Sequence, residues 1–359
     1  MTVSGLFVIV FDMELNDKLP KVVVLGGGTG SHMILTGLRH FPLDLQAIVS
    51  MADDGGSTGV LRTELGILPP GDLRQALIAL SDLDGFMINL LNHRFVGPVA
   101  GNIPGHSLGN MIIGAAEQVS IEEGLSYKDA LDHLHKFFRV KGRVWPVSFD
   151  SLVLHAESMT GQEYEGQHVI NTDKDLLSQK IKRVYYKNDP TANLHAIEAI
   201  LNADLIVLSP GNVFCSLLPI LTISGIAKAL KNTKAKVLMV SNLMTKFGHT
   251  DNFSTYDFFK LYENVVGASF VDFLLYNNSI PDKEMITRYE KEGELVVHKP
   301  EEFKDVKDVE VIGADILSGA SIPKLNSEDL TKFKVPRTLI RHNSQKVASE
   351  IFNILDRVI

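Results

Sequence analysis

The segment at positions 22–30, VVVLGGGTG, constrains the fold of this chain more than any other stretch. Four apolar residues lead directly into four glycines within five positions, and a helical pattern follows from Ser31 onward. A buried strand, a tight turn and a helix start account for this order, because glycine tolerates positive φ and lets a ligand approach backbone amides closely. Amides at a helix N-terminus favour an anion, usually a phosphate. The segment therefore predicts an α/β fold with a phosphate-binding turn, and a purely structural glycine turn is the alternative.

The glycine turn completes neither of the two common nucleotide-binding fingerprints. Ser31 stands where the third glycine of the dinucleotide motif would fall, and the Gly-Lys-Ser/Thr ending of a Walker loop is missing. The turn alone therefore leaves open which phosphate compound it binds.

Composition narrows the class of protein. The chain has 359 residues, of which 45% are hydrophobic and 22% charged, as in soluble globular proteins. Its net charge of −8 disfavours a general affinity for nucleic acid or anionic membranes. A single cysteine, Cys215, excludes an internal disulfide and fits a reducing compartment. We expect a cytoplasmic protein that neither binds nucleic acid nor inserts into a membrane, and a homo-oligomer is compatible with these totals.

Residues 1–19 form an N-terminal extension ahead of the first predicted strand. The apolar run at positions 6–11 is too short to span a bilayer, and it lacks the basic region and cleavage site of a signal peptide. An extra edge strand, a disordered extension and a translation start at Met13 are the three interpretations.

Residues 20–359 are expected to form one α/β domain. Further apolar strands are predicted at positions 46–51, 204–208, 236–240, 271–278 and 309–313. Alternating apolar and polar residues predict an antiparallel β-hairpin insertion at about 144–186, including the stretch 167–170. Helices are predicted over 190–201 and, with an amphipathic pattern, over 344–358.

Two adjacent carboxylates, Asp53 and Asp54, follow the second strand. Asp53 lies 27 positions after Gly26, close to where a doubly wound fold places the acid that binds a ribose. Paired acids beside a phosphate site can also hold a hard cation such as Mg²⁺ through oxygen. A solvated turn is the third interpretation.

Two further loops precede predicted helices. In Pro69-Pro70-Gly71-Asp72 the aspartate is placed to cap a helix, and Arg74 in the first turn of that helix faces either an anion or a carboxylate, or lies on the surface. The turn at 105–110, GHSLGN, sets His106 beside Ser107. We discount serine hydrolysis, because neighbours in sequence usually point apart and the G-x-S-x-G elbow is missing.

A second small-residue turn, at 209–216, follows the strand at 204–208 and again faces an anion. Another polar loop follows the strand at 236–240. Ligands of open α/β sheets bind outside the carboxyl ends of the strands. Two phosphate turns and an acidic pair at that edge imply a ligand with a diphosphate, such as a nucleotide or a nucleotide sugar.

With these motifs in order, the chain resembles the YvcK/CofD-like family, and within it the gluconeogenesis factor (YvcK) branch. The stretches that carry the resemblance are GGGTG at 26–30, ADDGGSTG at 52–59, GILPPGDLRQALIALS at 66–81, GHSLGN at 105–110, SPGNVFCSLLP at 209–219 and NLMT at 242–245. The resemblance implies a Rossmann-like three-layer sandwich with a mainly parallel sheet.

The resemblance also implies a function. In the gluconeogenesis factor branch, it implies a regulatory protein that binds UDP-sugars such as UDP-N-acetylglucosamine and supports cell shape and envelope growth on gluconeogenic carbon sources, with no established reaction. The CofD branch implies instead a Mg²⁺-dependent transfer of a phospholactyl group from a nucleotide-activated donor to a deazaflavin. NAD-dependent oxidoreduction is a third hypothesis, favoured only by the Rossmann-like opening.

The motifs also carry roles onto residues of this chain. The resemblance implies that Gly27, Gly28, Thr29 and Gly30 hold a phosphate, and that Asp53 and Asp54 lie at the reaction or metal position, with Mg²⁺ as the candidate cation. It implies further ligand-binding residues at Gly55, Arg74, His106 and Asn110, a second phosphate cradle at Gly211 and Asn212, and a nucleoside side at Asn242 and Thr245.

The chain departs from the family pattern in two loops. The second phosphate loop usually reads Pro-Gly-Ser-aliphatic-Tyr-Thr-Ser, whereas this chain has Asn212, Phe214 and Cys215 in place of the serine, tyrosine and threonine. After NLMT the pattern usually carries Gly-Glu-Thr, and here His249 replaces the glutamate. The first change bears on phosphate affinity, and the second on ligand choice or on the charge of the site.

Overall fold

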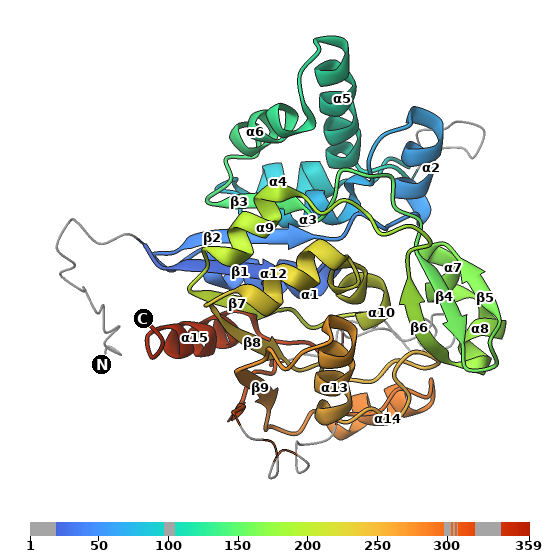
Figure 1. Cartoon of the computed structure of the whole chain (residues 1–359), viewed down its shortest axis with the longest axis vertical. Helices are drawn as coiled ribbons and strands as arrows, with labels where there is room; N and C mark the ends of the chain where they lie inside the picture. Colours follow the sequence, from blue (N-terminus) through green and yellow to red (C-terminus); the bar gives the residue numbers. More distant parts are fainter. Residues whose placement is uncertain (1–18, 97–104, 298–302, 304–305, 307, 320–338) are drawn as a thin grey trace.

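A seven-stranded parallel sheet organises the protein in the computed structural model, which describes residues 19–96, 105–297, 303, 306, 308–319 and 339–359 (Figure 1). The strand order is β10-β9-β8-β7-β1-β2-β3, and every neighbouring pair runs parallel. The order reverses between β1 and β7, which makes this pair the topological switch point of a doubly wound sheet. The predicted N-terminal extension lies outside the described residues, apart from Leu19.

The bounds of the elements are as follows. The strands are β1 Lys21–Leu25, β2 Asp44–Val49, β3 Arg143–Pro146, β4 His155–Ser158, β5 Glu163–Glu165, β6 Ile181–Tyr185, β7 Leu205–Leu208, β8 Lys236–Val240, β9 Phe273–Asn277 and β10 Glu310–Ala314. The helices are α1 Gly28–Leu38, α2 Gly56–Leu65, α3 Pro70–Ala79, α4 Gly85–Asn92, α5 Leu108–Glu122, α6 Tyr127–Phe137, α7 Gln167–Thr172, α8 Lys174–Gln179, α9 Leu194–Leu201, α10 Val213–Ser216, α11 Leu218–Leu221, α12 Ser224–Asn232, α13 Thr255–Val266, α14 Lys283–Glu290 and α15 Ser344–Leu355.

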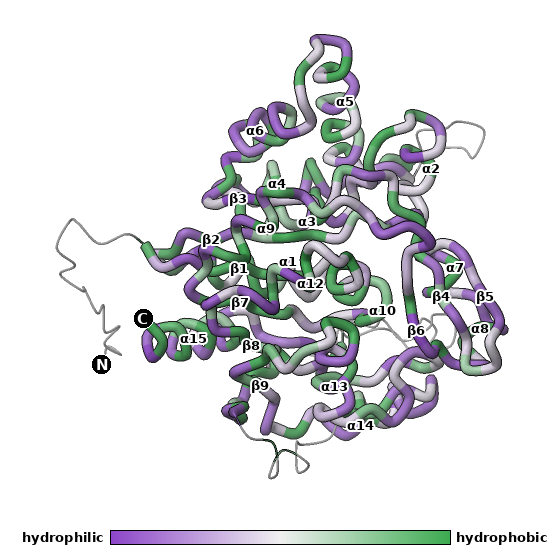
Figure 2. Tube along the Cα trace, in the orientation of Figure 1, coloured by the Kyte–Doolittle hydropathy of each residue, from purple (hydrophilic) through white to green (hydrophobic). Residues whose placement is uncertain are grey.

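The apolar runs form the centre of the sheet because helices cover it on both faces. Strands β1 and β7 have almost no exposed surface, as expected for parallel strands buried on both sides. Helices α1, α3 and α15 pack together in one layer, and α9, α11, α12 and α13 pack together in another. Figure 1 shows α9 and α12 in front of the sheet. Hydrophobic and hydrophilic stretches succeed one another along α15 (Figure 2), and its buried residues recur at the three- and four-residue intervals of an amphipathic helix. The predicted three-layer α/β fold is thus confirmed.

The structure contains an antiparallel sheet within the insertion predicted at 144–186, but the two ends of this prediction differ in detail. Strand β3, at its start, pairs parallel with β2 and closes the edge of the main sheet. A separate antiparallel sheet of β5, β4 and β6 follows, and it lies beyond the carboxyl ends of the main strands (Figure 1). The stretch 167–170, predicted as part of the hairpin, belongs to α7, whose first amides donate to the distant Asp54 carboxylate. A contact between residues so far apart leaves no local signal in the sequence.

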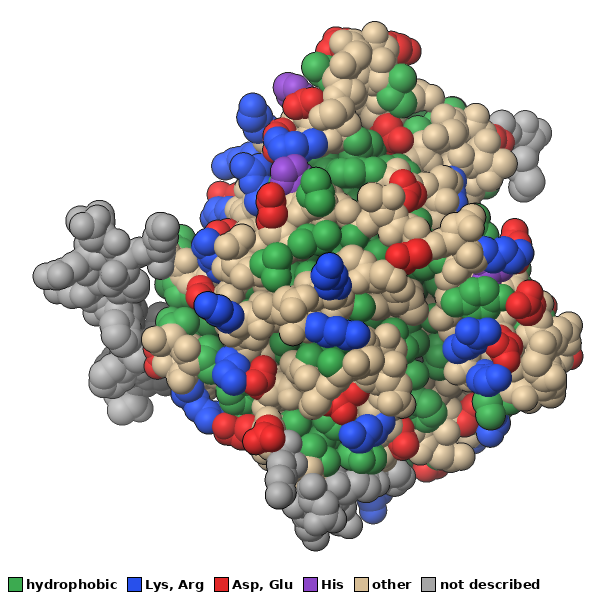
Figure 3. Space-filling model, in the orientation of Figure 1, with side chains coloured by type: hydrophobic (Ala, Val, Ile, Leu, Met, Phe, Trp, Pro, Cys, Tyr) green, Lys and Arg blue, Asp and Glu red, His purple; other side chains and the backbone are tan. Residues whose placement is uncertain are grey.

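Two observations bear on the partners expected from the sequence, namely the length of the apolar helices and the distribution of surface charge. None of the described helices is long and apolar enough to cross a membrane. On the face drawn in Figure 3, basic and acidic side chains are interspersed, without a large area of one sign.

Helix α15, which lies near the end of the chain, packs on α1, which lies near its beginning. A Cβ atom added to Gly37 of α1 would lie 2.2 Å from the carbonyl oxygen of Ser344 and 2.7 Å from Cβ of Ala348. The two helices therefore approach closely because residue 37 has no side chain.

We predict that Gly37→Ala destabilises the fold. Alanine in a helix interior is usually better than glycine by about 1 kcal/mol, but here the added methyl group overpacks the contact, so we expect a net loss of about 1–3 kcal/mol. Urea unfolding measures the change. Gly85→Ala in α4 is the control, because its Cβ would meet no heavy atom within 4 Å. Equal stabilities of the Gly37 and Gly85 variants would contradict the prediction.

Candidate functional site

The two glycine turns of the sequence lie side by side at the switch point. The turn at 26–30 follows β1 and leads into α1, and the turn at 209–212 follows the neighbouring strand β7. A Cβ atom on Gly30 would lie 1.7 Å from the carbonyl oxygen of Pro210, so the two backbones touch. Gly28 has a φ of +66° and Gly211 a φ of +145°, which favour glycine at both positions. The helix after the second turn, α10, has only four residues, so the second turn offers no long helix N-terminus.

Between the turns lies a cavity of about 290 Å³, here called the glycine-turn cavity. It is lined by Gly27, Gly28, Thr29, Gly30, Asp53, Asp72, Gln167, Asn171, Gly211, Asn212, Cys215, Ser216 and Lys246. Lys246 is the only lysine or arginine among these described lining residues, and sequence reasoning did not select it. Its ammonium group donates to the side-chain oxygen of Asn171.

Asp72 does not cap α3 as predicted; it reaches across to the first glycine turn. Helix α3 begins at Pro70, and the Asp72 carboxylate accepts a hydrogen bond of 2.9 Å from the Gly28 amide. Burial, and then the nearby Asp53 charge, raise the pKa of Asp72 from 3.8 to about 7. Burial likewise raises the pKa of Asp53. Two partly buried carboxyl groups therefore line the cavity beside the amides on which the sequence predicts a phosphate.

Asp54 points away from Asp53. Its carboxylate accepts hydrogen bonds from the amides of Gln167 at 3.1 Å and His168 at 2.6 Å, which fastens α7 and the small sheet to the end of β2. The two acids that line one cavity are thus Asp53 and Asp72. Two carboxylates, completed by water and ligand phosphate, are the usual protein share of a Mg²⁺ site. The described residues contain no group of three or more histidine, cysteine or acidic side chains that could hold a metal by themselves.

A larger cavity of about 680 Å³, the outer cavity, opens from the same turns. It shares Thr29, Gly30, Gly211, Asn212 and Lys246 with the glycine-turn cavity. Its far wall includes Tyr289, Glu294, Arg341, His342 and Asn343, none of which sequence reasoning singled out. The two cavities therefore adjoin at these shared residues.

The predicted nucleoside-side residues, Asn242 and Thr245, both line the outer cavity and both hold its backbone. The Asn242 side-chain amide donates to the Gly211 carbonyl at 2.7 Å and its oxygen accepts from the Gly211 amide at 3.2 Å. The Thr245 hydroxyl accepts from the Leu295 amide at 2.8 Å. The second glycine turn is therefore fixed by a side chain at the end of β8.

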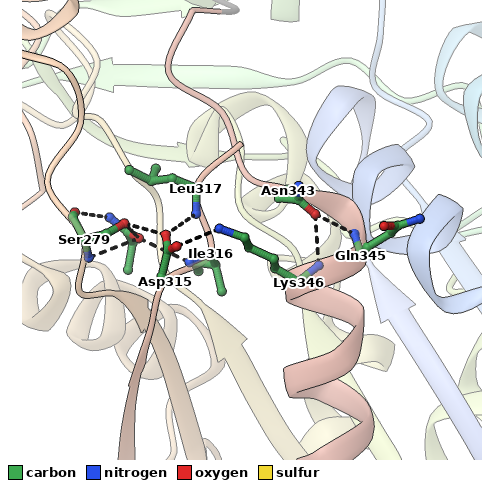
Figure 4. Close-up of polar contacts among 8 residues, drawn as sticks. Ser279, Asp315, Ile316, Leu317, Asn343, Gln345 and Lys346 are labelled. Atoms are coloured by element: carbon green, nitrogen blue, oxygen red, sulfur yellow. Dashed lines mark hydrogen bonds and ion pairs between the residues drawn. The ribbon is translucent and has the colours of Figure 1, made fainter. Parts of the chain in front are cut away.

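The residues 341–344, which line the outer cavity, are followed by α15, and several polar contacts fix the start of this helix. Figure 4 shows Lys346 of α15 extended toward Asp315, with a nitrogen–oxygen distance of 2.6 Å. This lysine, followed by the Ser279 hydroxyl, lowers the pKa of Asp315 to about 2. Asn343 caps α15 by accepting from the amides of Gln345 and Lys346, both at 3.0 Å. These contacts hold the segment 341–344 against the cavity.

A third cavity of about 510 Å³, the arginine cavity, lies on the other side of Asp53. It contains the remaining predicted site residues: Gly55, Arg74, His106 and Asn110. The His106 ring does not bond its neighbour Ser107, which instead accepts from the Asn110 amide as the cap of α5. Nδ1 of His106 lies 2.8 Å from the hydroxyl of Ser57, a contact that the sequence interval of 49 residues conceals.

The residues that depart from the family pattern lie largely in the interior. The rings of Phe214 and His249 meet edge to face with their centroids 5.9 Å apart, and both residues are buried. Burial raises the pKa of the Cys215 thiol to about 12. Asn212 donates to the side-chain oxygen of Asn171 at 3.0 Å and lines both the glycine-turn and outer cavities.

Comparisons with known proteins find relatives that are similar in sequence and in fold. The family model described as 2-phospho-L-lactate transferase CofD matches residues 22–317. A Bacillus subtilis protein named gluconeogenesis factor is 35% identical over 338 residues, which cover 94% of this chain and 98% of that protein. A Listeria innocua protein of the same name is 36% identical over 341 residues, covering 94% and 96%. A crystal structure of a UPF0052 family member from Bacillus halodurans superposes with a TM-score of 0.81 at 32% identity, covering 94% of this chain and 99% of that chain.

The buried carboxyl group at the glycine turn predicts a pH dependence of stability. Native Asp72 retains its proton up to a pH of about 7, whereas an unfolded aspartate releases it near 3.9. The unfolded chain then binds fewer protons between these values, so the free energy of unfolding falls as the pH rises, by an amount on the order of 4 kcal/mol.

Asp72→Asn removes this dependence, because the amide oxygen still accepts from Gly28 but the side chain no longer ionises. We expect the variant to lose less stability than the parent protein between pH 5 and pH 7.5, as measured by urea unfolding. Glu64→Gln, an exposed change on α2, is the control. Parallel pH profiles for the parent and the Asp72 variant would show the prediction to be wrong.

Proposed function

The chain belongs to the CofD family, and from this premise we propose that it is a regulatory protein that binds a nucleotide sugar of the UDP-N-acetylglucosamine type. Its relatives carry the name gluconeogenesis factor. The proposal includes a cytoplasmic location and a role in cell morphogenesis and envelope growth under gluconeogenic conditions. Binding of the nucleotide sugar would report the supply of envelope precursors to the cell.

The observation that carries the proposal is the set of residues that line both the glycine-turn cavity and the outer cavity. A diphosphate fits the part that the cavities share, where Thr29, Gly30, Gly211 and Asn212 meet Lys246. The amides at the N-terminus of the 11-residue α1 and the Lys246 ammonium group supply positive charge there. The outer cavity, at about 680 Å³, lies within the usual range for small-molecule sites and accommodates the nucleoside.

The Asp72 carboxylate has a consequence for this binding mode. It accepts a hydrogen bond from the Gly28 amide, which is a group that a bound phosphate would also use. A diphosphate at the glycine turn must therefore displace the carboxylate, meet it in the protonated state, or share a cation with it. Each route lowers the repulsion between Asp72 and the ligand.

A second function is favoured by one specific observation, the pair Asp53 and Asp72 beside the glycine turn. In the CofD branch the function would be a Mg²⁺-dependent transfer from a nucleotide-activated donor. The two carboxylates would hold the cation, and Mg²⁺ would neutralise charge on the transferring group. The side chains of this chain would bind and orient the donor phosphates.

We predict that the protein binds UDP-N-acetylglucosamine or UDP-glucose in isothermal titration, and more tightly than NAD or GTP. Lys246→Gln should weaken the binding about tenfold or more, because a charge-assisted contact with the diphosphate is lost. Lys141→Gln is the matched control, since that lysine pairs with Asp82 on the surface, outside the residues that line the two cavities. No binding of either UDP-sugar would overturn the proposal.

The transferase alternative predicts Mg²⁺-dependent release of a nucleoside monophosphate from an activated donor. Asp53→Asn should abolish this release while the fold, followed by circular dichroism, is retained. Release without Mg²⁺, or no turnover with a broad panel of acceptors, would count against the transferase.

A further inference from the structure

The arginine cavity stands apart from the two cavities proposed for the nucleotide sugar. It shares a single lining residue, Asp53, with the glycine-turn cavity and none with the outer cavity. Among its described lining residues, Val60 is the only one with an apolar side chain. A cavity of about 510 Å³ with so polar a lining favours a small hydrophilic ligand.

The cavity carries two guanidinium groups, those of Arg74 and Arg94. Arg74 is only 7% exposed. It donates to neutral partners, the side-chain oxygens of Asn110 at 2.8 Å and of Asn92. Arg94 donates to the Gly105 carbonyl at 2.8 Å. No carboxylate of the described residues forms an ion pair with either arginine.

Two guanidinium groups held near one another without a paired acid repel each other. Burial, and then the nearby Arg94 charge, lower the pKa of Arg74, and the Asp72 charge opposes them only in part. A buried charge with only neutral hydrogen-bond partners costs free energy, and a bound anion would recover part of that cost. The arginines therefore favour a ligand of negative charge.

The fold adds the positive ends of three helices to the same cavity. Helices α2, α3 and α5 have 10, 10 and 15 residues, and each begins among or next to the lining residues. The caps of α2 and α3, Gly55 and Pro69, make no side-chain cap bond, so the first amides of these helices are not held by their own caps. Helix N-termini attract anions through these amides and through the macrodipole.

A directed chain of hydrogen bonds sets the polarity of the remaining groups. Arginine can only donate, so the Asn110 oxygen faces Arg74 and its NH₂ group faces the Ser57 hydroxyl at 3.4 Å. The Ser57 hydroxyl also forms a hydrogen bond with Nδ1 of His106, 2.8 Å away. His106 is 6% exposed. The hydrogen bonds thus link polar side chains of α2, α3 and α5 with His106 in the turn before α5.

The one acid of the cavity is already engaged. Asp53 accepts from the Gly55 amide at 3.1 Å and also bonds Thr58. Burial raises the pKa of Asp53. With two arginines and one acid among its described lining residues, the cavity carries a net positive formal charge.

We propose that the arginine cavity binds a second ligand, a small hydrophilic organic anion of about the size of a monosaccharide that carries a phosphate or carboxylate group. Arg94 and Arg74 hold the anionic group, and the hydroxyl and amide groups around Ser57 and Asn110 bind the rest. This site is independent of the two nucleotide-sugar cavities, so it stands whether or not they bind a UDP-sugar.

Isothermal titration with inorganic phosphate and, in a second arm, with acetate tests the proposal at constant ionic strength. We expect saturable binding of at least one of these probes, and the two arms show which anionic group is preferred. Arg94→Gln should weaken this binding about tenfold, because a charge-assisted contact is lost. Arg94 is exposed, so the change is compatible with folding. Arg143→Gln at the amino end of β3, an arginine paired with Asp132, is the matched control and should leave binding unchanged.

Three further measurements separate the possible sites. Phosphate should still bind in an Arg94-dependent manner to the Lys246→Gln variant, which excludes the glycine-turn cavity as its site. The imidazole NMR signal of His106, assigned through a His106→Gln variant, should shift on titration with the bound probe. Ser57→Ala should alter that shift by breaking the hydrogen bond to Nδ1.

Each of three results would overturn the inference. These are the absence of saturable binding of both probes, binding that Arg94→Gln leaves unchanged, and competitive loss of the Arg94-dependent binding when UDP-N-acetylglucosamine is added. The last result would assign the arginine cavity to the nucleotide-sugar site itself. Failure of UDP-sugar binding alone would leave the second site standing, so the two proposals fail separately.

Discussion

The contact between the two glycine turns is the constraint on which the rest of the site depends. Gly30 lies against the carbonyl of Pro210 with no room for a Cβ atom. Because β1 and β7 are hydrogen-bonded neighbours at the switch point, their turns emerge side by side, and only backbone fits between them. Glycine at this position therefore serves packing first. The amides and the cavity between the turns follow from that packing, which joins the structural and the phosphate-binding interpretations of the motif.

The sequence was sufficient for features that depend on local patterns. Apolar runs mark the buried parallel strands, and the small-residue turn after β7 marks the second half of the switch point. Features that depend on distant contacts left no such signal. The position of Asp72 in the sequence predicts a helix cap, yet its carboxylate accepts a hydrogen bond from the amide of Gly28, 44 residues away. The partner of His106 is Ser57, not the adjacent serine. Lys246 became a candidate only when the structure placed it between the two turns.

The departures from the family pattern also take their meaning from the structure. Phe214 lies in α10 and His249 in the turn after β8, but their rings contact one another in the interior. The two changes therefore act as one packing unit, and they leave the backbone of Gly211 pinned by Asn242. Asn212 alone among them lines both the glycine-turn cavity and the outer cavity.

The docking of α15 on α1 has a consequence for biosynthesis. Helix α1 lines part of the outer cavity and is translated near the beginning of the chain, whereas the segment 341–344, which also lines this cavity, is translated near its end. A nascent chain on the ribosome therefore holds the first glycine turn long before the cavity beside it can close. The outer cavity comes into being only once translation has delivered α15, so incomplete chains lack a complete outer cavity even when most of their sheet has formed.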